Sequence, residues 1–159
     1  MNQKAIIGRA EYVWLVGENI KKVPARIDTG ARTSSIWASD IKESESGLEY
    51  KLFGVNSPYY TGKTIKTTRF SKIVVASSNG HAQERYKVPI TIQIKNRRIR
   101  TFCTLANRST QAFPVLVGRN TLKGKFIVDV QNGPHLLDVL DQDRFSELQS
   151  LYKGTQDKL

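Results

Sequence analysis

Apolar and polar residues alternate along most of this 159-residue chain, in short runs separated by turn-forming residues. Alternation with a period of two predicts strands that bury one face and expose the other. Such runs span residues 11–16, 22–27, 34–41, 48–55, 72–76, 86–94, 99–105 and 126–130. Hairpin turns are expected at residues 17–19, 78–80 and 95–96, of which Asn79-Gly80 is the strongest signal. The spacing predicts an all-β sandwich or small closed barrel.

Helical periodicity occurs only late in the chain. A short helical turn is predicted over residues 119–122, before Gly124 releases the chain into its last strand. A second helix is predicted within residues 135–159, where Leu140, Phe145 and Leu148 share one side. The polar segment 56–70 is expected to be a long connection. We therefore expect one domain over residues 1–134 and a helical extension over residues 135–159 that packs on it.

Composition limits the class and the compartment. The length suits a single domain with a real core. The single cysteine, Cys103, cannot form an internal disulfide, so an oxidising compartment is not required. The sequence has neither the apolar core of a signal peptide nor an apolar run of membrane-spanning length. These features predict a cytoplasmic protein that does not contact a membrane.

The net charge of +11 favours an acidic partner, because excess Lys and Arg attract anions over a long range. The densest basic segment is 95–100, in which Arg98 and Arg100 share one face of a predicted strand. Charges of this kind also protect edge strands from aggregation. Nucleic-acid binding through this segment, with bases stacked on Tyr59, Tyr60 or Phe70, is an alternative that we do not favour.

The strongest candidate for chemistry is Asp28-Thr29-Gly30-Ala31, which follows the predicted strand 22–27. Alone, such a triplet is an ordinary turn that ends a strand. A second segment, Val115-Leu116-Val117-Gly118-Arg119-Asn120, lies downstream. Retropepsin-like aspartic proteases carry such a segment at this distance from their Asp-Thr-Gly, and this resemblance implies a carboxylate that activates water, the general-base step that amide hydrolysis needs.

In this order the two segments resemble the retropepsin-like aspartic proteases, and in particular the RimB-like, RimK-associated family also called ATP-dependent zinc proteases. The resemblance covers residues 6–131 and includes further matching stretches at 11–13, 25–34, 77–80, 84–85, 104–105, 107–108 and 128–130. It implies a retropepsin-like (acid protease) closed barrel with a short helix after Gly118. Residues 115–117 would pack beneath the catalytic loop, and Gly118 would permit a close chain crossing.

The resemblance implies an aspartic peptidase in which Asp28 activates the water, with Thr29 and Gly30 completing the catalytic loop. The Thr29 hydroxyl is expected to bond neighbouring backbone, and Gly30 to let backbone approach the carboxylate. The chain has one Asp-Thr-Gly, so a dyad that shares one proton requires Asp28 from two subunits. A homodimer is therefore predicted. A catalytically inactive peptide-binding module is the alternative.

The resemblance also implies a flap at the 77–84 hairpin tip and a substrate site. Substrate-binding residues are expected at Ala31, Ser78, Asn79, Gly80, His81, Arg85 and Arg108. The two arginines suit carboxylates because a guanidinium can donate two parallel hydrogen bonds, although structural salt bridges explain them equally well. RimK-type ATP-grasp ligases append glutamates to a protein C-terminus. The implied peptide or protein substrate is therefore an acidic or glutamylated tail, and the implied functional link is to such a ligase.

The zinc and ATP of the family's name find little support in the residues. His81, Cys103 and His135 lie far apart and no His-Glu-x-x-His helix is present. Phe126 stands where a phosphate-binding loop needs Ser or Thr. No metal and no cofactor are expected. Arg32 also stands where viral retropepsins have aspartate, so Arg119 cannot form the equivalent ion pair.

Overall fold

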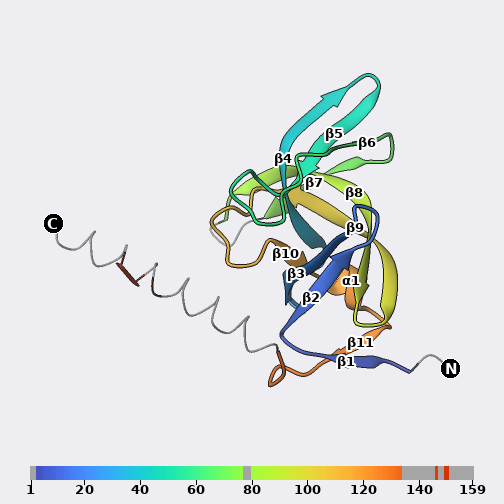
Figure 1. The fold of residues 1–159 in the computed structure, drawn as a ribbon, viewed down its shortest axis with the longest axis vertical. Coiled ribbons are helices and arrows are strands. Elements are labelled where there is room, and N and C mark those ends of the chain that lie inside the picture. Colours follow the sequence, from blue (N-terminus) through green and yellow to red (C-terminus); the bar gives the residue numbers. More distant parts are fainter. Residues whose placement is uncertain (1–2, 77–79, 134–145, 147–148, 151–159) are drawn as a thin grey trace.

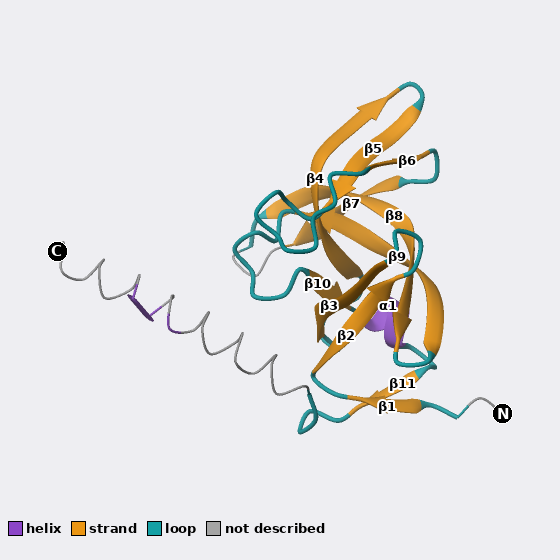
Figure 2. Cartoon of the chain, in the orientation of Figure 1, coloured by secondary structure: helices purple, strands orange, loops and turns teal. Residues whose placement is uncertain are grey.

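The computed structural model describes residues 3–76, 80–133, 146 and 149–150. Its elements, shown in Figures 1 and 2, are β1 (Ala5–Ile7), β2 (Ala10–Leu15), β3 (Ile20–Ile27), β4 (Ser34–Ser44), β5 (Gly47–Leu52), β6 (Thr64–Thr67), β7 (Ser71–Ala76), β8 (Ala82–Ile94), β9 (Arg97–Ala106), β10 (Val115–Val117), α1 (Arg119–Leu122) and β11 (Phe126–Val128). The all-β class is confirmed, and α1 coincides with the predicted helical turn.

Six strands close into a barrel in the order β10-β3-β2-β8-β9-β4, because β10 pairs with both β3 and β4. Val115 pairs with Ala25 in the parallel direction and with Ile36 in the antiparallel direction. Closure removes the free sheet edges that would otherwise pair with other chains. The short β10 is therefore the strand that joins the two ends of the sheet.

The core fills this barrel with the alternate residues that the sequence pattern selects. Val13, Val23, Val88, Ile94 and Val117 are each at most 1% exposed. Burial of apolar surface, at about 25 cal/mol per Å², is the main force that holds the strands together. The period-two pattern is therefore the direct cause of the barrel.

Two arms extend from the barrel. β4 continues beyond it to pair with β5, and β7 pairs with β8 as a hairpin. Glu43 on β4 joins the arms, because its carboxylate accepts a 2.7 Å hydrogen bond from the Tyr86 hydroxyl and lies 2.9 Å from Lys72 Nζ. The bond to Lys72 lowers the pKa of Glu43. The β7–β8 hairpin is thus fixed at its base.

Three sequence expectations need correction. Residues 64–67 lie in the segment expected to be a connection but form β6, which pairs with β5. β5 stops at Leu52 rather than at residue 55, because Phe53 has a left-handed φ of 65°. β1 was not expected; it pairs in parallel with β11. β1 and β6 are too short to show a clear alternation of apolar and polar residues, and they form strands because they pair with β11 and β5.

Some expectations fall outside the described residues. These are Ser78 and Asn79 of the flap tip and most of the helical extension over 135–159. Within the part of the chain that the structure describes, no helix is long and apolar enough to cross a lipid bilayer.

Cys103 provides a test of the closed barrel. It is 2% exposed, and burial raises the pKa of its thiol to about 12. Because the thiolate is the reactive form, a thiol reagent at pH 8 should not label the native protein and should label one thiol per chain in denaturant. Rapid labelling of the native protein would contradict the closed core.

Candidate functional site

The Asp28 carboxylate lies at the carboxyl end of β3, held by its own loop. Asp28 Oδ1 accepts hydrogen bonds from the backbone amides of Gly30 at 2.9 Å and Ala31 at 3.2 Å. The Asp28 amide donates to the Val117 carbonyl at 2.9 Å, which ties the loop to β10. Asp28 Oδ2 accepts no hydrogen bond from the described residues. Backbone amides of the loop therefore hold Oδ1, whereas no described residue holds Oδ2 by a hydrogen bond.

Gly118 lets the chain cross closely behind this loop. A Cβ atom there would lie 2.8 Å from the Thr33 carbonyl carbon. The crossing brings two amides onto the loop, because Arg119 donates to the Ala31 carbonyl at 2.8 Å and Asn120 donates to the Arg32 carbonyl at 3.0 Å. The predicted role of Gly118 in a close crossing agrees with this geometry.

A chain of hydroxyls anchors α1 beneath the loop. The Ser34 hydroxyl lies 2.6 Å from that of Thr121, which in turn lies 2.7 Å from that of Thr101. Ser34 Oγ also accepts from the Gly118 amide at 2.9 Å, and the Asn120 side-chain oxygen accepts from Ser34. Ser34, Thr101 and Thr121 are buried, so each lost bond would leave a polar group unsatisfied. Sequence periodicity did not indicate this network.

Arg119 bonds backbone carbonyls, whereas an aspartate at position 32 would form an ion pair with it. Its guanidinium donates to the carbonyls of Thr29 at 3.1 Å and Gly30 at 2.9 Å. The Thr29 hydroxyl, expected to bond backbone, makes no hydrogen bond with the described residues. The Asp-Thr-Gly triplet is therefore held through its backbone carbonyls by the Arg119 guanidinium, rather than through the Thr29 side chain.

Three arginines gather near Asp28. Arg108 Nε donates to the Phe113 carbonyl at 2.9 Å, and the Arg26 guanidinium lies 4.7 Å from the centre of the Phe113 ring. Burial, followed by the positive charges of Arg85 and Arg26, lowers the pKa of Arg108, whereas the charge of Asp28 opposes this shift. The charges of Arg26, Arg85 and Asp28 thus each act on Arg108.

This arginine cluster, Arg26, Arg85 and Arg108, draws on three separate elements. Arg26 is on β3, Arg85 is on the β7–β8 hairpin, and Arg108 follows β9. Burial also lowers the pKa of Arg85. Sequence reasoning selected Arg85 and Arg108 and missed Arg26, although Arg26 lies only two residues before Asp28. The signal was available, because positions two apart on a strand face the same side.

The other predicted substrate residues are less closely grouped. Ala31 is half-buried and contacts the Asp28 carboxylate, whereas Gly80 and His81 are exposed beside the start of β8. Arg98 and Arg100 are both exposed on β9. Arg98 lies 5.1 Å and Lys21 lies 4.9 Å from the Trp14 ring centre, so part of the basic segment makes contacts within the protein. No cluster of potential metal ligands occurs among the described residues.

Comparison with known proteins agrees with this geometry. The family model described as retropepsin-like aspartic endopeptidase RimB matches residues 6–133. The chain belongs to the RimB-like family. A probable alpha-L-glutamate ligase from Shewanella pealeana is 32% identical over 136 residues, which are 80% of this chain and 29% of that protein. A second probable alpha-L-glutamate ligase, from Parasynechococcus marenigrum, is 27% identical over 156 residues, which are 96% of this chain and 33% of that protein.

This RimB-like chain therefore spans about a third of the length of the curated relatives that it matches. Among solved structures, a Legionella pneumophila protein of unknown function (DUF785) has a TM-score of 0.57 and 21% identity, over 84% of this chain and 98% of that one. At this identity the likeness supports the fold alone.

A glycine pair tests the close crossing. Gly118→Ala should lower the free energy of unfolding by about 1–3 kcal/mol, the usual cost of overpacking, because the new methyl group meets Thr33 backbone. Gly17→Ala is the matched control, since a Cβ there has nothing within 4 Å. Urea denaturation provides the measurement. Equal stability of the two variants would contradict a tight contact at Gly118.

Proposed function

We propose that this protein is an aspartic peptidase that cleaves acidic protein tails, with Asp28 from two protomers forming the catalytic dyad. The observation that supports this most directly is the Asp28 carboxylate itself, with Oδ1 held by two backbone amides and Oδ2 without a hydrogen bond from any described residue. Preorganised groups of this kind lower the cost of reaching the transition state. Membership of the RimB-like family points to the same chemistry.

In the proposed reaction the two carboxylates share one proton. The ionised carboxylate takes a proton from water as the water oxygen attacks the scissile carbonyl carbon, and the protonated carboxyl gives its proton to the carbonyl oxygen. The resulting tetrahedral diol then collapses, the C–N bond breaks, and the amine leaves with a proton from a dyad carboxyl. Since each chain has a single Asp-Thr-Gly, the dyad forms at a two-fold axis.

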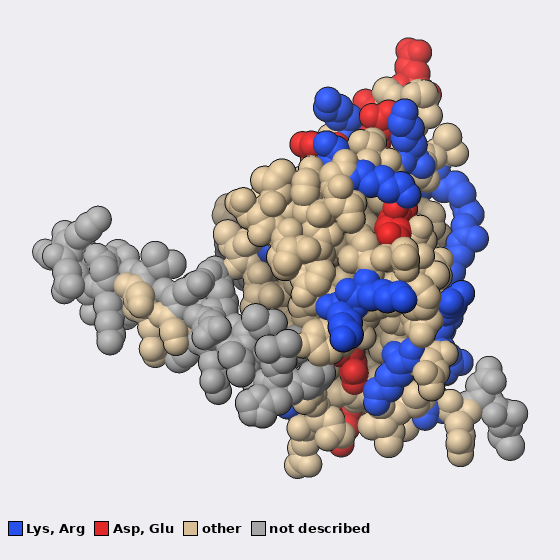
Figure 3. Space-filling view, in the orientation of Figure 1, with Lys and Arg blue, Asp and Glu red and all other residues tan. Residues whose placement is uncertain are grey.

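The arginine cluster supports an acidic substrate. Arg108 lies in the field of Asp28 and of two further arginines, and its guanidinium would bind a glutamate side chain next to the scissile bond. Acidic side chains gather elsewhere, over the β4–β5 hairpin at the top of Figure 3, where Lys51, Lys66 and Lys72 pair with Asp40, Glu49 and Glu43. The overall excess of positive charge would then attract an acidic tail toward the cluster.

The names of the curated relatives suggest where such a tail originates. They are probable alpha-L-glutamate ligases of about three times the matched length, so in them a related segment is part of a larger chain. We infer that this protein works alongside a ligase of that class and cleaves peptide bonds of the kind that the ligase forms. Cytoplasmic location follows from this partnership as part of the same proposal.

Replacement of the carboxylate tests the mechanism. Asp28→Asn should reduce hydrolysis of an oligoglutamate-tailed peptide by at least about a thousandfold, because the amide cannot act as a base. Asn retains the oxygen that Gly30 and Ala31 bind, so the unfolding temperature should change little. Activity per protomer in the wild type should also fall on dilution. Undiminished cleavage by purified Asp28→Asn would overturn the proposal.

An arginine pair tests the substrate class. Arg85→Gln should raise KM for the acidic peptide about tenfold, corresponding to about 1.4 kcal/mol of lost interaction, and should weaken its salt dependence. Arg100→Gln removes the same charge from an exposed position on β9 and should change KM little. Equal effects of both variants would mean that only net charge matters. RNA binding that is retained by Asp28→Asn, in a protein without hydrolysis, would instead favour the nucleic-acid module.

A further inference from the structure

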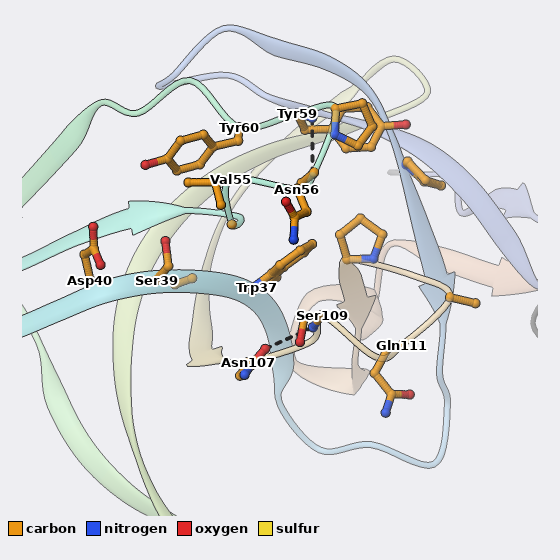
Figure 4. Close-up of a pocket in the computed structure, with 17 residues that line it drawn as sticks. Trp37, Ser39, Asp40, Val55, Asn56, Tyr59, Tyr60, Asn107, Ser109 and Gln111 are labelled. Carbon is orange, nitrogen blue, oxygen red and sulfur yellow. Dashed lines mark hydrogen bonds between the residues drawn. The ribbon is translucent and has the colours of Figure 1, made fainter. Parts of the chain in front are cut away.

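A second cavity lies beside the arginine cluster and takes no part in the proposed catalysis. It has a volume of about 680 Å³ and is shown in Figure 4. Its walls come from β3, β4, the loop after β5 and the loop between β9 and β10, and include Pro24, Trp37, Val55, Tyr59, Tyr60 and Gln111. We call it the aromatic cavity.

The aromatic cavity differs from the arginine cluster in charge. No Lys or Arg is among its lining residues, and its only charged side chain, Asp40, is paired with Lys51 at 3.0 Å. The side of the molecule that carries the loops after β5 and after β9 in Figure 1 is largely uncharged in Figure 3. An acidic tail would gain nothing electrostatic here, so a different part of a ligand must fit this cavity.

Its walls suit an uncharged polypeptide. The Trp37 ring packs closely on Gly54, where a Cβ atom would lie 2.6 Å from it, and the Trp37 carbonyl accepts a hydrogen bond from the Phe53 amide at 2.8 Å. Val55 is 76% exposed at the rim. Figure 4 shows the amides of Asn56, Asn107 and Gln111 around the same space. Aromatic surface with surrounding amides binds apolar side chains and backbone groups of a peptide.

The aromatic cavity and the arginine cluster share the loop after β9. Pro24 lies four residues before Asp28 on β3, which is about 13 Å along an extended strand. The loop after β9 separates the two regions, with Arg108 near Asp28 and with Asn107, Ser109 and Gln111 lining the cavity. Four residues of an extended substrate span the same distance, so a substrate bound at Asp28 is long enough to reach the cavity.

We propose that the aromatic cavity binds the uncharged segment of the substrate protein that adjoins the acidic tail. This inference rests on the proposed function and adds to it. The arginine cluster holds glutamates, the aromatic cavity holds the neutral sequence beside them, and the enzyme thereby prefers the junction between the two. Tails attached to a protein are then better substrates than free oligoglutamate.

Two peptides test this preference. One is an octaglutamate, and the other carries the same octaglutamate after a neutral segment that contains proline and aromatic residues. The wild type should cleave the junction peptide with a KM about tenfold below that of octaglutamate. Trp37→Ala should remove most of this difference in KM. Trp14→Ala is the control, because Trp14 lies on β2 outside the cavity.

A blocking variant covers the case in which Trp37→Ala does not fold. Asn56 is exposed at the cavity, so Asn56→Phe fills the space without removing a core contact. It should raise KM for the junction peptide alone. Equal KM values for the two peptides in the wild type would overturn the inference, as would a preference that survives Asn56→Phe.

A binding measurement separates this inference from the proposed catalysis. In an Asp28→Asn, Trp14→Phe protein, Trp37 is the only tryptophan, and the neutral segment alone should change its fluorescence on binding. Binding without any hydrolysis by the wild type would refute the peptidase and retain the cavity. Hydrolysis by the wild type without binding of the neutral segment would refute the role of the aromatic cavity and retain the peptidase.

Discussion

The insertion of β10 between β3 and β4 is the constraint on which the rest of this structure depends. It closes the barrel, because β10 supplies the missing neighbour for both strands. It also fixes the candidate site, since the Val117 carbonyl accepts from the Asp28 amide and the next residue, Gly118, passes against Thr33. Core stability and site geometry therefore share the same contacts, and a change in one alters the other.

Arg119 holds the Asp28 loop through backbone carbonyls rather than through an ion pair with residue 32. With Arg32 in place of an acidic residue, the Arg119 guanidinium bonds two backbone carbonyls of the triplet. Arg119 forms no ion pair with a carboxylate of the described residues, so its charge adds to the positive field around Asp28. The same field suits an acidic ligand, so the structural brace and the proposed specificity have one electrostatic origin.

Much of this fold could be predicted from the sequence. Long strands with period-two burial, such as β2, β8 and β9, were found because each presents a full apolar face to the core. The helix α1 was found from its local residue pattern, whereas the Asp28 loop and Gly118 were found from their resemblance to the retropepsin-like family. β1 and β6 were missed, since three or four residues contain too little pattern and exist as strands only through pairing. The aromatic cavity was missed because its walls are contributed by four separate segments.

The sequence by itself determined the all-β class, the family resemblance and the single Asp-Thr-Gly triplet, because these depend on residue order and on local backbone chemistry. The tertiary structure decided which distant side chains meet. Arg26, Arg85 and Arg108 share an electrostatic neighbourhood only because β3, the β7–β8 hairpin and the loop after β9 converge there. Likewise Ser34, Thr101 and Thr121 form one hydroxyl chain only after the barrel closes. Such contacts join residues tens of positions apart, and no local pattern encodes them.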